Sequence, residues 1–280
     1  MAEVRINPDS DETGDVQMQA GDDDIVEIGE TGAADPANGG TGEEPSTAEA
    51  EASSPARVTF VDYLRSPIVE LVIGPSDSQT VLFAHQGLLT RSPWFEQNLS
   101  EGSSKRIELP NTDLEAISCF LEYLYTGEYF PAKLPSGILA SDSTTPAIDE
   151  SGAQLLKHAK VYTLAEKLGV TQLKSLSHSK IHLVTSSASA ELTYARYVYS
   201  HTARTDNTIR RPVASFWGQR SHVLRHETEG SFRQMCLEYP EFAFDVLSFV
   251  LDAEERRIRA KRQGGAGDEE PKSARKRARA

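Results

Sequence analysis

The sequence predicts an α/β (α+β) fold, in which a small sheet is wrapped by helices and followed by an all-helical C-terminal region, between two disordered tails. Every Trp, Tyr and Phe lies between Phe60 and Phe249, so only the middle of the 280-residue chain can bury a large core. Within that middle part, short β-branched runs come first and helical repeats of apolar residues follow.

The two ends of the chain carry opposite charge. Residues 1–56 hold fifteen acidic residues, one base (Arg5) and no aromatic residue. Such a segment cannot bury enough apolar surface to offset the entropy of ordering it, so we expect a disordered acidic tail. From Arg256 onward the chain has ten bases and three acids, and we expect residues 259–280 to be a disordered basic tail.

Cysteine content and hydropathy bear on the compartment in which the protein resides. Cys119 and Cys236 are the only cysteines, and both lie in apolar helical patterns, as is typical of buried thiols in a reducing compartment. No apolar run approaches the roughly 18 residues of a membrane span, and residues 1–13 lack the features of a secretory signal. We therefore expect a soluble intracellular protein, in the nucleus and/or cytoplasm, with no membrane partner.

Three short runs predict the strands of the sheet. Residues 68–73 are rich in β-branched side chains and end at Gly74, residues 80–83 form a second such run, and residues 105–109 alternate polar and apolar. Between the second and third strands we predict two short helices, at 84–92 and 93–99.

Capping signals mark the longer helices. Thr112 and Glu115 fit a capping box, and the apolar periodicity that follows ends at Gly127. Ser151 and Gln154 fit another capping box, before a helix that Gly169 closes.

The remaining elements rest on weaker patterns. Thr171 is expected to cap a helix that runs to about residue 184. Residues 130–150 show no periodicity and are predicted to be a surface insertion. Further helical patterns lie at 192–199, 209–217 and 242–258, with no strand expected between 189 and 256.

Six segments, taken in order, resemble a BTB/POZ domain. They are Ser66-Pro-Ile-Val-Glu-Leu-Val-Ile-Gly74, Phe83-Ala-His-Gln86, Leu89-Thr-Arg-Ser-Pro-Trp-Phe95, Ile107-Glu-Leu-Pro110, Phe120-Leu-Glu-Tyr-Leu-Tyr-Thr-Gly-Glu-Tyr129 and Tyr162-Thr-Leu-Ala-Glu-Lys167. The match covers about 66–184, and we assign 57–185 to this domain. Residues 189–256 are similar to the helical C-terminal part of many BTB proteins of filamentous fungi, so 186–258 is assigned as a helical C-terminal region.

The resemblance implies a protein that has no active site and no cofactor and works by presenting surfaces to protein partners. It implies a homodimer formed through the first helix and the segment ahead of the sheet. The corresponding residues are Phe60, Tyr63, Leu64, His85, Leu88 and Leu89. The alternative is that these apolar side chains cover the core of their own chain.

The resemblance also implies two possible roles. Some BTB proteins recruit substrates to cullin-type ubiquitin ligases through an apolar-x-Glu element, which Leu99 and Glu101 match. The link from Leu99 to Ile107 is shorter than in family members that use this element. The other role is a nuclear transcription or chromatin cofactor that oligomerises through the BTB domain.

Each tail contains one short motif. Ile25, Val26 and Ile28 are flanked by acids and look like a SUMO-interacting motif, which would add as a strand to a partner's sheet; the alternative is a chance apolar cluster. The second motif has the spacing of a bipartite nuclear localisation signal, and its basic residues are Lys261, Arg262, Arg275, Lys276 and Arg277. A solvated tail or loose phosphate contact is the alternative, and no specific nucleic-acid partner is expected.

No residue pattern supports an enzyme or a metal site. His178/His182 and His222/His226 are spaced i, i+4, as in some metal sites, but neither pair has a third ligand at a known spacing. Nucleophile-elbow, phosphate-loop, dinucleotide-binding and paired-Cys motifs are absent from the sequence. We therefore predict no catalytic residue, no metal and no cofactor.

Overall fold

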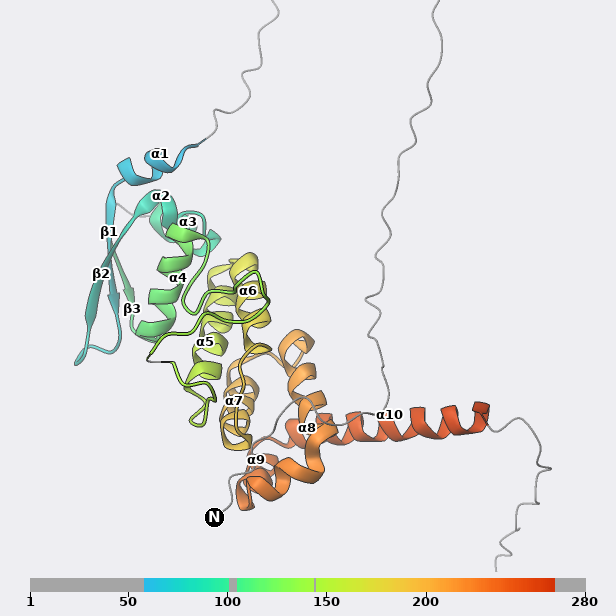
Figure 1. The fold of residues 1–280 in the computed structure, drawn as a ribbon. Coiled ribbons are helices and arrows are strands. Elements are labelled where there is room, and N and C mark those ends of the chain that lie inside the picture. The colour runs from blue at the N-terminus through green and yellow to red at the C-terminus, as the bar shows by residue number, and fades with distance from the viewer. Residues whose placement is uncertain (1–57, 101–104, 144, 265–280) are drawn as a thin grey trace, which may run out of the picture. The chain divides into compact units, whose positions relative to one another are not determined.

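The computed structural model describes residues 58–100, 105–143 and 145–264, drawn in Figure 1. Its elements are α1 (Phe60–Arg65), β1 (Ile68–Ile73), β2 (Thr80–His85), α2 (Gln86–Leu89), α3 (Pro93–Ser100), β3 (Arg106–Leu109), α4 (Leu114–Thr126), α5 (Ala153–Leu168), α6 (Thr171–Ile181), α7 (Ala188–His201), α8 (Asn207–Glu227), α9 (Gly230–Glu238) and α10 (Pro240–Gly264). The expected class, a small sheet in a mostly helical α/β chain, is confirmed. None of the helices described is long and apolar enough to cross a membrane.

The sheet has the strand order β2-β1-β3. β1 pairs antiparallel with β2, with Ile68 opposite His85, and parallel with β3, with Glu70 opposite Arg106. The second strand is two residues longer than predicted, and α2 is correspondingly shorter than the predicted helix 84–92. Ala84 and His85 belong to the strand because they pair with β1, and local propensity does not predict this pairing.

A first core fills the space between one face of the sheet and the helices beside it. Val69, Leu71 and Ile73 of β1 are buried and belong to one cluster with Phe95 of α3 and Phe120 of α4. The last two rings are stacked, with their centroids 5.8 Å apart. This core covers only the helix-facing side of the sheet, and the other side carries exposed residues around the buried Val72.

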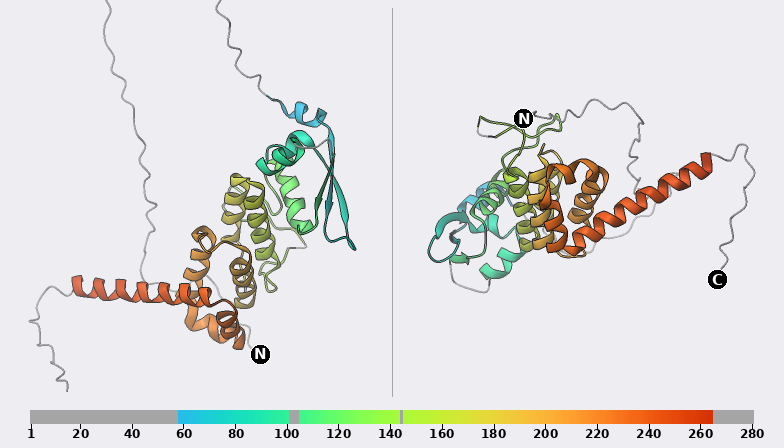
Figure 2. Two further views of the ribbon diagram at one scale, coloured as in Figure 1. Left: turned by 180° about the vertical axis from the view of Figure 1, so that it is seen from behind. Right: turned by 90° about the horizontal axis from the view of Figure 1, so that it is seen from below.

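A second core lies among the helices that follow. Trp217 of α8 and Phe242 of α10 are fully buried there, with ring centroids 5.9 Å apart. Where α8 meets α10, a Cβ on Gly218 would lie 2.8 Å from the Phe249 ring, so a glycine is required at this approach. α10 crosses α8 and continues beyond it, as Figure 2 shows.

Helix α5 supplies side chains to both cores. Leu164 and Leu168 belong to the first core, whereas Leu155 and Tyr162 belong to the second. The predicted boundary near residue 185 therefore lies within one compact unit, which begins at Pro55. Burying two faces of one helix fixes the two cores relative to each other.

The C-terminal ends of helices were predicted correctly where a glycine is the C-cap. The N-cap residues were predicted incorrectly. Gly127 and Gly169 adopt left-handed φ values of 81° and 73°, as expected for C-caps. The predicted N-caps Thr112, Ser151 and Thr171 are wrong. The residues in those positions are Asp113, Gly152 and Val170.

Asp149 explains the second of these errors. Its side chain is 1% exposed and accepts hydrogen bonds from the Gly152 and Leu155 amides at 2.8 and 3.0 Å. A buried carboxylate three residues ahead of the cap therefore takes the place of the capping box. Asp149 also forms an isolated bridge with Ser186, which ties the end of the predicted 130–150 insertion to the chain ahead of α7.

The C-terminal helices extend further than the sequence patterns indicated. The predicted helix 209–217 is part of α8, which continues to Glu227, and α9 was not predicted at all. Both differences fall in stretches rich in charged and polar residues, where only Leu224 and Met235 are buried apolar anchors. No further strand follows β3 in the part of the chain that the structure describes.

Candidate interaction surface

α1 is a helix without a buried residue. Phe60, Val61 and Leu64 are 50%, 51% and 42% exposed, and Val58 ahead of the helix is 58% exposed. Exposed large side chains are ordinary when they are scattered, but four within seven residues form a patch. A patch of this kind on a short helix is typical of a contact surface for another molecule.

Hydrogen bonds cap both ends of α1, and one at the C-terminal end ties the helix to α2. The Asp62 carboxylate accepts hydrogen bonds from the Thr59 amide and hydroxyl, both at 2.7 Å, and these bonds hold the pKa of Asp62 below its usual range. At the other end, the Ser66 hydroxyl donates to the Tyr63 carbonyl at 2.6 Å and accepts from the Gly87 amide at 2.8 Å. The apolar surface of α1 is therefore presented by an anchored helix.

The predicted dimer residues of α1 divide into two groups. The Tyr63 ring is half-buried and packs on the first core. A Cβ on Gly87 would lie 3.1 Å from this ring, which shows how closely α1 approaches α2. Tyr63 is thus the attachment of α1 to its own chain, while Phe60 and Leu64 remain available to a partner.

Leu88 and Leu89 require a correction. Both were predicted to lie in the dimer surface, but they are 1% and 0% exposed and belong to the first core. The short helix α2 turns them inward beneath the sheet, so they have no surface to offer. His85 is half-buried at the end of β2, where its Nδ1 lies 2.7 Å from the Tyr125 hydroxyl.

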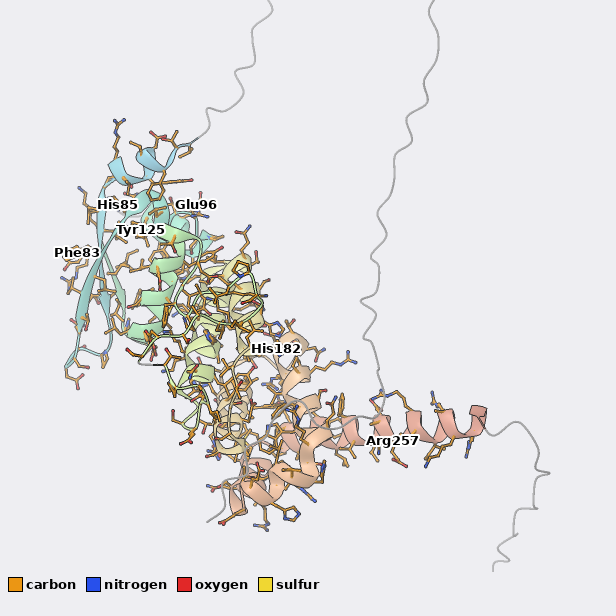
Figure 3. All side chains as sticks on the ribbon, viewed as in Figure 1. Phe83, His85, Glu96, Tyr125, His182 and Arg257 are labelled. Atoms are coloured by element: carbon orange, nitrogen blue, oxygen red, sulfur yellow. The ribbon has the colours of Figure 1, made fainter. Side chains whose placement is uncertain are left out.

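The outer face of the sheet carries exposed residues that were not predicted to form a surface. Ile68, Val81 and Phe83 are 45%, 41% and 67% exposed. Figure 3 shows Phe83 on the side of the sheet away from α4. The absence of charge in residues 80–85 was the one sequence signal that could have found them, because exposed edge strands usually carry charged residues.

The β3 side of the same face is charged. Arg106 forms ion pairs with Glu70 at 3.5 Å and with Glu108 at 3.7 Å. These pairs are partly exposed and contribute little to stability. The outer face is therefore apolar along β2 and polar along β3.

The residues matched to a cullin contact are not available as a pair. Leu99 is 7% exposed and belongs to the first core, and Glu101 lies outside the described residues. The Leu99 side chain is therefore committed to its own chain. A cullin contact at this position could not use the Leu99 side chain.

The tail motifs lie mostly outside the described residues. This applies to Ile25, Val26 and Ile28, and to the second basic cluster at 275–277. Lys261 and Arg262 are exposed near the end of α10, and a receptor could reach them there.

A buried polar group joins α6 to the end of α4. Lys180 is fully buried and donates to the Glu128 carboxylate and, at 2.6 Å, to the Tyr129 carbonyl. The Tyr129 hydroxyl lies 2.9 Å from Nδ1 of His158, whose Nε2 is buried without a partner. Burial lowers the pKa of Lys180, and it lowers the pKa of His158 to about 3, so this imidazole is neutral.

Among the histidine pairs, only one has its rings in mutual contact in the described residues. Nε2 of His178 and Nε2 of His182 are 3.2 Å apart on α6. Burial and the neighbouring His178 lower the pKa of His182. No group of three or more potential His, Cys, Asp or Glu ligands exists within the described residues.

Comparison with known proteins adds no relative, since no protein-family model matches this chain and no curated protein matches it. The class of molecule is therefore defined by its own geometry. It is an α/β protein with a small sheet, one core between the sheet and its helices, a second core among the later helices, and exposed apolar residues on α1 and β2.

Proposed function

We propose that this protein is a homotypic protein–protein interaction module of the BTB/POZ type that acts as a scaffold. The observation that carries the proposal is the exposed apolar surface of α1, formed by Phe60, Val61 and Leu64. The resemblance over 66–184 supports the same reading, because its segments fall in or next to β1, β2, α2, α3, β3, α4 and α5.

Physical chemistry favours a second copy of the chain as the partner of α1. Each Å² of apolar surface removed from water contributes roughly 25 cal/mol, and large exposed side chains therefore stabilise a contact that covers them. A two-fold axis lets one patch cover the same patch on its partner, which is the commonest arrangement of soluble homo-oligomers. The capped ends of α1 reduce the ordering cost of binding.

Sedimentation velocity of the full chain over a range of concentrations tests this proposal. The variant combines Phe60→Ser, Val61→Ser and Leu64→Ser, and we expect its self-association to weaken at least tenfold. The matched control is Leu237→Ser on α9, which removes a leucine that is 65% exposed elsewhere. Unchanged association of the triple variant, or a wild-type monomer at every concentration, would contradict the proposal.

The scaffold's cellular role has two candidate forms, a nuclear cofactor and a cullin adaptor. Exposure of Lys261 and Arg262 favours nuclear import, whereas burial of Leu99 argues against an adaptor that uses this side chain. We therefore place the nuclear cofactor first. Affinity capture of the tagged chain from its native cells discriminates between them: a recovered cullin would reverse this order.

A further inference from the structure

β2 lies at the end of the sheet, so one edge of its backbone faces no other strand among the described residues. The Gln86 amide donates to the Pro67 carbonyl at 2.8 Å, and these residues continue the register in which Ile68 lies opposite His85. In an antiparallel ladder, hydrogen-bonded and non-hydrogen-bonded pairs alternate. Thr80, Leu82 and Ala84 therefore bond to β1, while Val81, Phe83 and His85 direct their N–H and C=O groups away from it.

The bonds between β1 and its other neighbour give an independent check. The Glu70 amide donates to the Lys105 carbonyl at 2.6 Å, and the Gly74 amide donates to the Leu109 carbonyl at 3.2 Å. Even-numbered residues of β1 thus face β3, which leaves odd-numbered residues to face β2. Both sides of β1 therefore assign the same outward groups to β2.

Part of this edge is already satisfied within the chain. The His85 amide donates to the Tyr125 hydroxyl at 3.1 Å, which closes the edge at that end. No hydrogen bond joins the outward groups of Val81 and Phe83 to another described residue. Two N–H donors and two C=O acceptors remain, next to side chains that are 41% and 67% exposed.

Edge strands are usually protected by charged residues or proline. β2 has the sequence Thr-Val-Leu-Phe-Ala-His, with no Lys, Arg, Asp, Glu or Pro. The strand therefore combines unpaired backbone groups, apolar side chains and no charge that would repel another strand.

We propose that β2 pairs antiparallel with β2 of a second copy of this chain, with the two-fold axis at Leu82. Val81 then lies opposite Phe83 of the second copy, and Phe83 lies opposite Val81 of the second copy. Each chain donates two hydrogen bonds and accepts two, so all the free groups are satisfied. The two three-stranded sheets become one sheet of six strands.

The side chains support this register. Val81 and Phe83 lie on the same outer face, so each aromatic ring meets a β-branched side chain across the new pair. A foreign strand could use the same four bonds, but in the second copy a two-fold axis at Leu82 pairs the two outward residues of each chain with each other and leaves no outward group of either residue over. The occupant is therefore the chain's own β2.

This contact is separate from the one proposed for α1 and does not rest on it. A chain with two different two-fold contacts forms assemblies larger than a dimer, whereas a chain with either contact alone stops at the dimer. The two proposals can thus be tested independently in the same full-length protein.

The decisive variant is Val81→Pro, with Val81→Thr as its matched control. Proline removes the outward N–H and leaves the bonds between β1 and β2 intact, as is tolerated in edge strands. Threonine keeps both the N–H and the β-branched shape. Phe83→Lys is the second variant, because it places a charge at the proposed contact without touching the backbone.

Sedimentation velocity in the background of the α1 triple variant gives the readout. We expect this background to form a dimer, Val81→Thr to keep it, and both Val81→Pro and Phe83→Lys to weaken it at least tenfold. A background that is monomeric at all concentrations, or a dimer that survives both disruptive variants, would overturn the proposal.

Amide exchange of the unmutated chain provides a test that does not depend on the folding of a variant. Protection of the Val81 and Phe83 amides should increase with protein concentration. Protection that is independent of concentration would mean that a segment of the same chain covers this edge, and it would also overturn the proposal.

Discussion

The hydroxyl of Tyr125 on α4 accepts the backbone amide of His85 at 3.1 Å and lies 2.7 Å from Nδ1 of the same histidine. One side chain thereby ends the free edge of β2 and fastens the sheet to the first core. The centroids of the two rings are 5.8 Å apart. Both residues are labelled in Figure 3.

Tyr125→Phe should lower the free energy of unfolding by about 1 kcal/mol, because it removes the hydroxyl from a partly buried hydrogen-bonded pair. Urea unfolding followed by circular dichroism measures the loss. The control is Tyr123→Phe, whose hydroxyl makes a longer bond of 3.3 Å to Gln172. Equal losses in the two variants would contradict the role assigned to Tyr125.

Asp149→Ala should lower the free energy of unfolding by about 3 kcal/mol, because it leaves the Gly152 and Leu155 amides buried without an acceptor. The same denaturation measurement applies. Asp113→Ala, at the more exposed N-cap of α4, serves as the comparison and should cost about 1 kcal/mol. A loss for Asp149→Ala no larger than this would show that water replaces the carboxylate.

Stability should fall when the pH is lowered from 7 to 5. The pKa of His158 is depressed to about 3 in the folded chain by burial, so between that value and its ordinary pKa of 6.5 only the unfolded chain binds the proton. Linkage then gives a loss of about 2 kcal/mol in the free energy of unfolding between pH 7 and pH 5. Urea unfolding at both pH values measures it.

His158→Gln should flatten that pH dependence, and His222→Gln, at an exposed position on α8, should leave it unchanged. The same slope in both variants would show that other groups cause the loss. His182 also has a lowered pKa and contributes with the same sign.

Arg210→Met should lower the free energy of unfolding by about 4 kcal/mol. The guanidinium is 5% exposed and donates to the Tyr199 and Thr202 carbonyls at 3.2 and 2.7 Å, and to Glu241 at 2.9 Å. Its removal leaves the Tyr199 and Thr202 carbonyls at the end of α7 without this donor, while Glu241 keeps its ion pair with Arg204.

The neighbouring Arg211→Met is the control for this prediction. Arg211 is exposed, so its replacement should change the free energy of unfolding by less than about 0.5 kcal/mol. Similar effects of the two substitutions would mean that helix propensity, and not the Arg210 contacts, dominates.

The sequence predicted most of the elements but fewer of the surface roles. Periodicity and glycine stops located α4 and α5 because these signals are local. α9 was missed because its only buried residue is Met235, which leaves no apolar repeat to detect. In the candidate surface, Phe60 and Leu64 were found by resemblance, while Leu88 and Leu89 were assigned to the wrong side of the chain.

Local pattern and composition were enough to predict the class of fold, the three strands, most of the helices and the confinement of aromatic residues to one central region. Contacts between distant segments place Leu88 in the core, supply Asp149 as the acceptor at the start of α5, and leave Val81 and Phe83 on an edge that no described strand covers. The type of a residue indicates that an apolar side chain must be buried or that a backbone group must be hydrogen-bonded, but it does not indicate by which segment. Which partner satisfies that need is decided when distant segments come together.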